Sequence, residues 1–294
     1  TGHGEASTTN TESSGLSRVQ DALSKQGYEL SSLDFSELRT SNPPTVLIIP
    51  SPSQPISPEG QHTVEEFVQN GGRLLLMADP NQEPPLPALL EKWGIELGSG
   101  ILADAQDRLG RGSPTALLVR TFTTHDITED FTSPILFPVS RSVAFDPETG
   151  QEWDFVALAQ TSPNSWEEMD RTNSQPTFDE GQDPKGPFTV AGLLTSKARG
   201  PDGQPAKAVV IIGNSAFATN GYFTYPGNTD FFLKTIAWLA KEDALVTLTP
   251  KNPAFHPFVP NPSQEQALVF FQVLFLPLLT LFLGLSFWTF RRSP

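Results

Sequence analysis

Residues 45–78 read TVLIIPSPSQPISPEGQHTVEEFVQNGGRLLLMA, and this stretch decides the fold. Its two short apolar runs, Thr45 to Ile49 and Arg73 to Ala78, are typical of strands that are covered on both faces. The residues between them predict a helix, because Ser57 can cap it and Pro58 suits its first position. Strand, helix and strand in this order indicate a parallel pair joined by a helical crossover.

The same alternation continues outward from this unit. Apolar residues at helical spacing, each set followed by glycine, predict helices around Leu16 to Leu23, Val64 to Val68 and Leu86 to Trp93. Tyr28 to Phe35 alternates like a strand, Ala208 to Ile212 is a further buried strand, and Asp230 to Lys241 is an amphipathic helix. The predicted fold class is therefore α/β, with a parallel sheet that receives both segments.

The middle of the chain, residues 105–200, has a different character. Four short runs look like strands: Thr115 to Val119, Pro134 to Pro138, Phe155 to Ala159 and Phe188 to Leu194. Polar stretches rich in glycine and proline separate them and predict exposed loops. We interpret this region as a β-rich insertion or subdomain.

Composition excludes several functions. A formal charge of -14 repels nucleic-acid phosphates, so a nucleic-acid partner is not expected. With no cysteine, the chain can form neither a disulfide nor a thiolate nucleophile. The histidines at 3, 62, 125 and 256 lack the spacing of metal ligands, and no phosphate-binding glycine motif follows a strand. We therefore predict neither a metal nor a cofactor.

A long apolar stretch, Ala267 to Phe290, predicts a transmembrane helix. At about 1.5 Å per residue it would extend roughly 36 Å, enough to cross a hydrocarbon core of about 30 Å. Its Leu, Phe and Val residues outweigh the insertion cost of Gln272, Pro277 and Ser286. Polar groups and kinks within a span usually need a protein neighbour, so Gln272 and Pro277 are candidate contacts with a partner in the membrane.

The residues around this stretch predict its orientation. Arg291 and Arg292 would be retained on the cytoplasmic side, next to Trp288 as an interfacial anchor. The acidic domain would then lie outside the cytoplasm, at the inner (cytoplasmic) membrane. Thr249 to Gln266 carries five prolines, at 250, 253, 257, 260 and 262, and predicts an extended linker.

Polar residues gather where a parallel sheet would present its carboxyl edge, the usual ligand site of such folds. They are His3, Glu5, Asp79, Asn214 and Ser215. A functional interpretation places them in one pocket, with histidine or a carboxylate as base. The structural interpretation, which we favour, is that these residue types cap helices and loops. Residues 213–217, GNSAF, only half resemble a nucleophile elbow.

Several segments resemble a known family, the GldG-like auxiliary components of ABC-type transport systems that are associated with gliding motility. They are TGHGE at 1–5, GLSRVQDALSKQGYEL at 15–30, SPEGQHTVEEFVQNGGRLLLMADP at 57–80, LPALLEKWGIELGSGILAD at 86–104, VVIIGNSAFATNGYF at 209–223 and GNTDFFLKTIAWLAKED at 227–243. The apolar stretch ending in two arginines matches as well. Residues 105–200 match only loosely.

The resemblance implies a flavodoxin-like or class I glutamine-amidotransferase-like fold without a nucleophilic cysteine. It implies an ABC permease and its ATPase as partners, with the lipid bilayer as the site of anchoring. It also implies a strand directly before residue 1, with a longer N-terminal region and another span upstream, so the sequence is expected to be a fragment.

Three functions are weighed. The leading hypothesis is a non-enzymatic, membrane-anchored accessory subunit that docks on the permease or binds a substrate or envelope component. The second is an extracytoplasmic hydrolase that uses His3, Ser215 and Asp79. The third is a glycan- or peptide-binding module, which predicts a groove lined by exposed aromatic side chains such as Trp153 and Trp166, although core packing would explain these as well.

The predicted organisation follows from these segments. The divisions are the α/β domain in two parts at 1–104 and 201–248, the insertion at 105–200, the linker at 249–266, the transmembrane helix at 267–290 and a cytoplasmic tail at 291–294.

Overall fold

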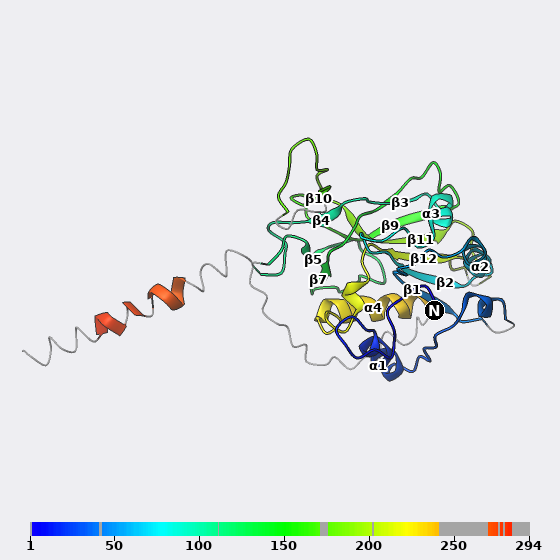
Figure 1. Ribbon diagram of the computed structural model, residues 1–294, viewed down its shortest axis with the longest axis horizontal. Helices are drawn as coiled ribbons and strands as arrows, with labels where there is room; N and C mark the ends of the chain where they lie inside the picture. The colour runs from blue at the N-terminus through cyan, green and yellow to red at the C-terminus, as the bar shows by residue number, and fades with distance from the viewer. Residues whose placement is uncertain are drawn as a thin grey trace, which may run out of the picture. The chain divides into compact units, whose positions relative to one another are not determined.

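The computed structural model describes most of the chain (Figure 1). The described residues are 2–40, 43–110, 112–170, 176–201, 203–240, 270–275, 277–278 and 280–283. Nearly all of those up to residue 240 form one compact unit, and residues 270–283 belong to a second. The two units are described separately.

A six-stranded mixed sheet forms the centre of the first unit. Its order is β1 (Val46–Pro50), β2 (Arg73–Met77), β12 (Ala208–Ile212), β11 (Thr189–Ser196), β9 (Trp153–Gln160) and β6 (Thr121–Phe122). The pairs β1–β2 and β2–β12 are parallel, and the pairs from β12 to β6 are antiparallel. The α/β class is confirmed, and one sheet does receive both segments. The sequence predicted a parallel sheet, and this is correct for the three strands β1, β2 and β12.

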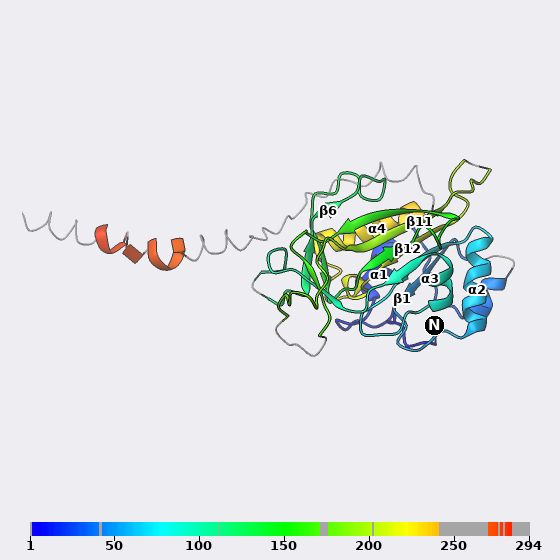
Figure 2. The ribbon, with the colours of Figure 1, turned by 90° about the horizontal axis from the view of Figure 1, so that it is seen from above.

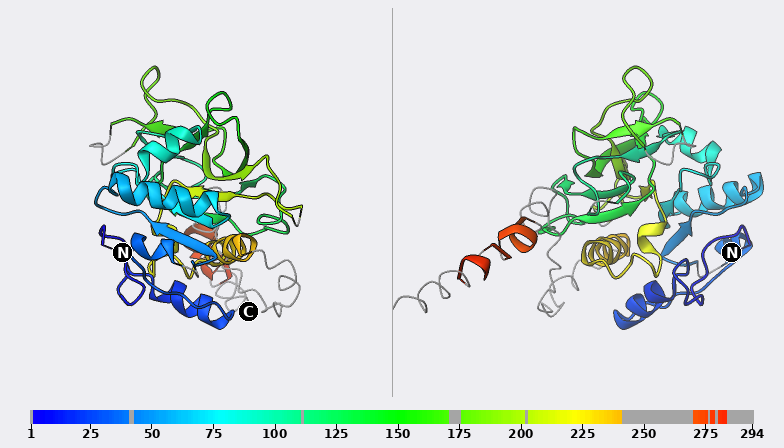
Figure 3. Two further views of the ribbon diagram at one scale, coloured as in Figure 1. Left: turned by 90° about the vertical axis from the view of Figure 1, so that its right-hand side faces the viewer. Right: turned by 60° about the vertical axis from the view of Figure 1, so that its left-hand side comes forward.

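Helices cover both faces of this sheet. They are α1 (Ser17–Lys25), α2 (Pro58–Gln69), α3 (Pro87–Lys92) and α4 (Pro226–Leu239). Alternate residues of β2 point to opposite faces, so Leu74 and Leu76 pack with α2 and α3 while Leu75 and Met77 pack with α1 and α4. Figures 2 and 3 show α2 and α3 on one side of the strands and α1 and α4 on the other.

The helix that the opening stretch predicts is confirmed. Ser57 accepts a hydrogen bond from the backbone nitrogen of Gly60 at 3.1 Å, and Pro58 occupies the first helical position. Gly71 follows the helix with φ of +92°, the left-handed conformation that favours glycine. The helix near the end of the chain is also present, but it begins at Pro226 rather than at Asp230 because proline suits the first turn.

The strand predicted for Tyr28 to Phe35 is wrong. Residues 28–34 pair with no strand in the described part of the chain, and Phe35 begins the short 3₁₀ helix η1 (Phe35–Arg39). Asp34 and Glu37 form a capping box, which starts a helical turn at the point where the strand should have continued. The alternation arises because Tyr28 and Leu30 pack partly against the core while Glu29 is exposed.

Residues 105–200 divide between the central sheet and smaller ladders. The strands β6, β9 and β11 extend the central sheet. Three two-stranded ladders pair β4 (Ile101–Ala103) with β10 (Trp166–Glu168), β3 (Ile95–Leu97) with β8 (Val143–Phe145), and β5 (Ala116–Val119) with β7 (Ile135–Pro138). All four predicted strands of this region are found. The predicted domain boundaries stay predictions.

The second unit contains the described part of the predicted span. A π-helical segment covers Phe271–Phe275, which includes the backbone of Gln272, and the carbonyl of Pro277 accepts a hydrogen bond from Thr280 Oγ1 at 2.8 Å. Among the described residues, no helix combines the length and the apolar character needed to cross a bilayer. The linker at 249–266, Trp288, Arg291 and Arg292 lie outside the described residues.

Candidate functional site

The three parallel strands bring their following loops together at one edge of the sheet. The strands β1, β2 and β12 run in the same direction in continuous register, and their last residues are Pro50, Met77 and Ile212. Ser51, Asp79 and Asn214 therefore follow at the same edge. This is the edge at which the sequence predicted a pocket.

Asp79 and Ser215 are in direct contact across this edge. The backbone nitrogen of Ser215 donates to Asp79 Oδ1 at 2.6 Å, and Ser215 Oγ donates to Asp79 Oδ2 at 2.6 Å. Each carboxylate oxygen thus accepts one hydrogen bond from the same residue. The pair connects the end of β2 to the loop after β12 and confirms that the two residues lie together.

Two further residues close around this pair. The backbone nitrogen of Asp79 donates to Ser51 Oγ at 2.9 Å. Arg141, which is 5% exposed, donates from Nη1 to the carbonyls of Asp79 and Gln82 at 3.2 Å each, and from Nε to the carbonyl of Gly98 at 2.8 Å. The guanidinium therefore covers the loop after β2 and satisfies its carbonyl groups.

Asn214 fixes a neighbouring loop. Its Nδ2 donates to the carbonyls of Pro138 at 2.5 Å and Val139 at 3.1 Å, and its Oδ1 accepts from the backbone nitrogen of Phe217 at 2.8 Å. Val139 has φ of +56°, which is strained for a β-branched residue. A fully buried amide that makes three hydrogen bonds to backbone groups serves the architecture of the loop.

His3 and Glu5 form a separate pair beyond the end of β1. His3 Nδ1 lies 3.7 Å from Glu5 Oε1, and the backbone nitrogen of His3 donates to Glu5 Oε2 at 3.0 Å. The carbonyl of His3 accepts from the backbone nitrogen of Gln54 at 2.9 Å. No hydrogen bond or ion pair joins either residue to Asp79 or Ser215, all four of which are described.

This arrangement limits the chemistry at the edge. A serine nucleophile needs a base that takes its proton, and no hydrogen bond links the two described residues His3 and Ser215. Both oxygens of Asp79 already accept hydrogen bonds, so Asp79 positions Ser215. Within the described ranges, no cluster of three or more acidic or histidine side chains could hold a metal ion.

The predicted aromatic groove is wrong for both of its named residues. Trp153 is 5% exposed and Trp166 is 4% exposed, so neither offers a ring face to a ligand. Trp153 packs edge to face against Trp93 with ring centroids 5.8 Å apart. Core packing therefore explains these side chains.

Sequence reasoning missed three residues that organise this end of the fold. They are Arg141, Asn220 and Asn228. Asn228 is fully buried, and its amide donates to the carbonyls of Leu136 and Phe217 at 3.0 Å while accepting from the nitrogen of Leu136 at 2.8 Å. Asn220 likewise donates to the carbonyls of Asn10 and Glu12 at 2.9 and 2.7 Å. Each of these two asparagines adjoins a glycine, at 221 and 227, and this pairing was a usable signal for a turn with side-chain to backbone bonds.

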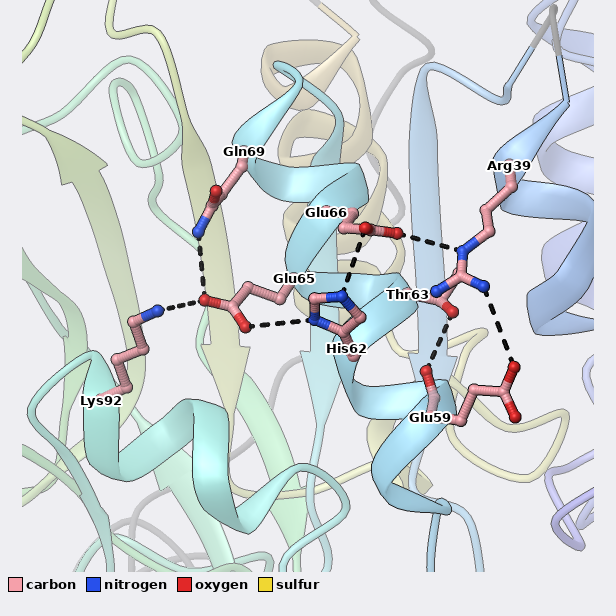
Figure 4. Close-up of polar contacts among 8 residues, drawn as sticks. All are labelled: Arg39, Glu59, His62, Thr63, Glu65, Glu66, Gln69 and Lys92. Carbon is pink, nitrogen blue, oxygen red and sulfur yellow. Dashed lines mark hydrogen bonds and ion pairs between the residues drawn. The ribbon is translucent and has the colours of Figure 1, made fainter.

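A polar network lies on the outward face of α2 (Figure 4). Glu65 pairs with Lys92 of α3, while Glu66 pairs with Arg39 of η1 at 3.0 Å. His62 Nε2 lies 3.3 Å from Glu66 Oε1, and its side chain is 60% exposed. Exposed pairs of this kind contribute at most about 1 kcal/mol each, so we assign the network to the surface.

Comparison with known proteins adds a family match. Residues 1–235 match the family described as "ABC-type uncharacterized transport system". No curated protein sequence matches the chain.

Solved structures show related folds at low sequence identity. A structure described as "mmIFT52 N-terminal domain" superposes with a TM-score of 0.56 at 14% identity, covering 80% of this chain and 96% of that one. This likeness shows a shared fold. A putative ThuA-like protein from Bacteroides uniformis has a TM-score of 0.42 at 13% identity, with 80% and 89% coverage. A cytoplasmic protein from Salmonella typhimurium has a TM-score of 0.40 at 13% identity, with 75% and 85% coverage.

Proposed function

Because this chain belongs to the ABC-type uncharacterized transport system family, we propose that it is a non-enzymatic, membrane-anchored accessory subunit of an ABC-type transporter. The family match over residues 1–235 is the observation that carries the proposal. It includes the whole sheet and most of α4, so it concerns the folded domain rather than an isolated motif.

The polar edge of the sheet supports the non-enzymatic part. Asp79, Ser215 and Asn214 use their polar atoms to bind one another or backbone groups. The guanidinium of Arg141 lies over the same loops. The hydrolase weighed above would need the imidazole of His3 beside Ser215, and the hydroxyl of Ser215 donates to the carboxylate of Asp79 instead.

The proposed topology rests on the sequence. Ala267 to Phe290 has the length and composition of a transmembrane helix, and Arg291 with Arg292 favours a cytoplasmic C-terminal side. The acidic domain would then lie outside the cytoplasm. There it would dock on the permease or bind a substrate or envelope component, and a role in gliding motility is one form that this could take.

The finer fold assignment is part of the proposal. Three parallel strands with α1 and α4 on one face and α2 and α3 on the other agree with a flavodoxin-like or class I glutamine-amidotransferase-like core. The antiparallel strands β11, β9 and β6 would then be an extension of that core.

Photo-crosslinking in native membranes tests the proposed docking. A photoreactive amino acid at Gln272 or Pro277 should crosslink to a permease subunit, because these residues are expected to contact a protein neighbour within the membrane. The same amino acid at Glu59, whose side chain is 85% exposed on the folded domain, is the matched control. Crosslinks to lipid alone from both membrane positions would contradict permease docking.

A further inference from the structure

A pocket of about 270 Å³ lies at the opposite edge of the central sheet from Asp79 and Ser215. Trp153, the first residue of β9, and Lys207, which directly precedes β12, line it from the sheet. The C-terminal ends of α2 and α3 and the loop before β9 complete its lining. All of the lining residues lie between positions 65 and 207 and belong to the described part of the chain.

The sheet holds Lys207 and Trp153 on the same face. Ser196 of β11 lies opposite Trp153, and it exchanges hydrogen bonds with the backbone of Lys207 at 3.0 Å in both directions. Residues that lie opposite one another on adjacent strands share a face of the sheet. Lys207 Nζ accordingly lies 6.0 Å from the centroid of the Trp153 ring, which is a cation–π distance.

Hydrogen bonds fix the loop that carries Glu148 and Glu152. Asp146 Oδ1 accepts from the backbone nitrogen of Glu148 at 2.9 Å, and Asp146 Oδ2 accepts from Thr149 Oγ1 at 2.5 Å. These bonds, that of the Thr149 hydroxyl first, lower the pKa of Asp146. The backbone nitrogen of Asp146 donates to the carbonyl of Gly94 at 2.7 Å and joins the loop to the end of α3. The pocket is therefore lined by ordered elements.

One of the two lysines that line the pocket already has a partner. Lys92 forms an ion pair with Glu65, and Glu65 Oε1 also accepts from Gln69 Nε2 at 3.1 Å (Figure 4). These three side chains use their polar groups on one another. They supply a polar rim rather than a free charge.

The other charged groups of the pocket are unpaired. Within the described ranges, the ammonium of Lys207 and the carboxylates of Glu148 and Glu152 form no hydrogen bond or ion pair. The pocket thus presents one positive group over an aromatic ring and two negative groups on a fixed loop.

This combination of charges restricts the ligand. A simple anion would meet Lys207 but would be repelled by the two carboxylates, and a simple amine would be repelled by Lys207. A molecule that carries both an ammonium and a carboxylate can pair each group with its opposite, through charge-assisted hydrogen bonds. The volume is below the range of about 300–1,000 Å³ typical of pockets for drug-sized ligands, so the ligand would be small.

We propose that this pocket binds a small zwitterion of the α-amino acid type, with its carboxylate on Lys207 and its ammonium on the carboxylates of Glu148 and Glu152. The inference is independent of the transport role, because it follows from the unpaired charges of the pocket.

Nuclear magnetic resonance on the full chain in detergent tests the proposal with L-alanine as the probe. The indole N–H resonance of Trp153, assigned with Trp153→Phe among the five tryptophans, reports on the pocket. It should shift on titration to about 20 mM and should saturate with a Kd of about 1 mM, as expected of a ligand with few atoms.

Matched probes separate the zwitterion from its two halves. N-acetyl-L-alanine keeps the carboxylate without the ammonium, and L-alaninamide keeps the ammonium without the carboxylate. Each should bind about tenfold more weakly than L-alanine, because each leaves a like charge of the pocket unanswered.

Variants assign the two ends of the ligand. Lys207→Gln should weaken binding of L-alanine about tenfold and leave L-alaninamide no weaker than before. Lys185→Gln is the matched control, since Lys185 also lies over an aromatic ring, 4.6 Å from the centroid of Phe178, but does not line the pocket. The double variant Glu148→Gln with Glu152→Gln should weaken L-alanine about tenfold and strengthen N-acetyl-L-alanine.

Three outcomes would overturn the proposal. The first is that L-alanine at about 20 mM leaves the Trp153 resonance in place. The second is equal binding of L-alanine and N-acetyl-L-alanine, which would make the pocket a site for simple anions. The third is unchanged binding of L-alanine in Lys207→Gln, which would place the ligand elsewhere.

Discussion

The carboxyl edge of β2 and β12 and the outer side of β1 lie on the same sheet but differ in how their polar groups are satisfied. At the first, Asp79 and Ser215 bond each other and Arg141 covers the loop. At the second, no hydrogen bond from a described residue reaches the outer side of β1, and apolar side chains line a groove there. The sequence analysis selected the polar residues at the carboxyl edge as the candidate site. The groove beside β1, in contrast, is lined largely by apolar side chains.

The largest effect on stability is expected from removing the carboxylate of Asp79, which binds Ser215 at the carboxyl edge of the sheet. Asp79→Ala takes away the acceptor of two Ser215 donors, one of them a backbone N–H, and should lower the free energy of unfolding by about 3 kcal/mol. Urea unfolding followed by circular dichroism measures the change. Glu59→Ala, at an exposed side chain, is the control and should stay within about 0.5 kcal/mol. A similar small loss for Asp79→Ala would mean that the edge is not closed as described.

A smaller effect is expected for a substitution of Ser215, the other member of this pair. It tests whether Ser215 has a structural or a catalytic role. Ser215→Ala keeps the backbone bond to Asp79 and loses only the hydroxyl bond, so it should cost about 1 kcal/mol of stability. Esters and amides offered to the wild-type chain should be turned over no faster than by this variant. Hydrolysis by the wild type that Ser215→Ala abolishes would support the hydrolase hypothesis instead.

The smallest expected effect is on the pH dependence of stability. It involves His125, which belongs to neither of the two regions. Burial lowers the pKa of His125 from its usual value of 6.5, and the nearby carboxylate of Asp126 opposes this only in part. The unfolded chain therefore takes up the proton at a higher pH than the folded chain. Stability should be full above about pH 6.5 and should fall as pH drops towards the lower folded pKa.

Unfolding measured from pH 7.5 to 5 checks this dependence. His125→Asn keeps an acceptor for the backbone nitrogen of Ile127 but cannot titrate, so the pH dependence should become shallower. Thr124→Asn, at an exposed neighbouring position without a titratable group, should leave it unchanged. An unaltered slope in His125→Asn would contradict the role of burial.

Local patterns made much of the fold predictable. Ser57 and Pro58 mark the start of α2, Gly71 marks its end, and the apolar run of residues 73–77 forms β2. Each of these signals lies within or directly beside the element that it predicts. The prediction for residues 28–34 was wrong because alternation alone does not supply a pairing partner, and the capping box at Asp34 favours a turn. Whether a strand forms depends on a neighbour elsewhere in the sheet.

The candidate site was predictable only in part. The ends of parallel strands meet at one edge, and this rule brought Asp79 and Ser215 together correctly. It could not show that Arg141, from the distant loop between β7 and β8, occupies the same edge. That contact joins residues 62 positions apart, and no local spacing in the sequence encodes it.

The most direct test of the transport assignment is to identify the chains that purify with this protein from native membranes in mild detergent. Quantitative mass spectrometry should find an ABC permease and its ATPase in constant proportion to the full chain. A form ending at residue 248 should lose them, because the predicted span is absent. Repeated recovery of the full chain alone, with the permease present in the same membranes, would contradict the assignment.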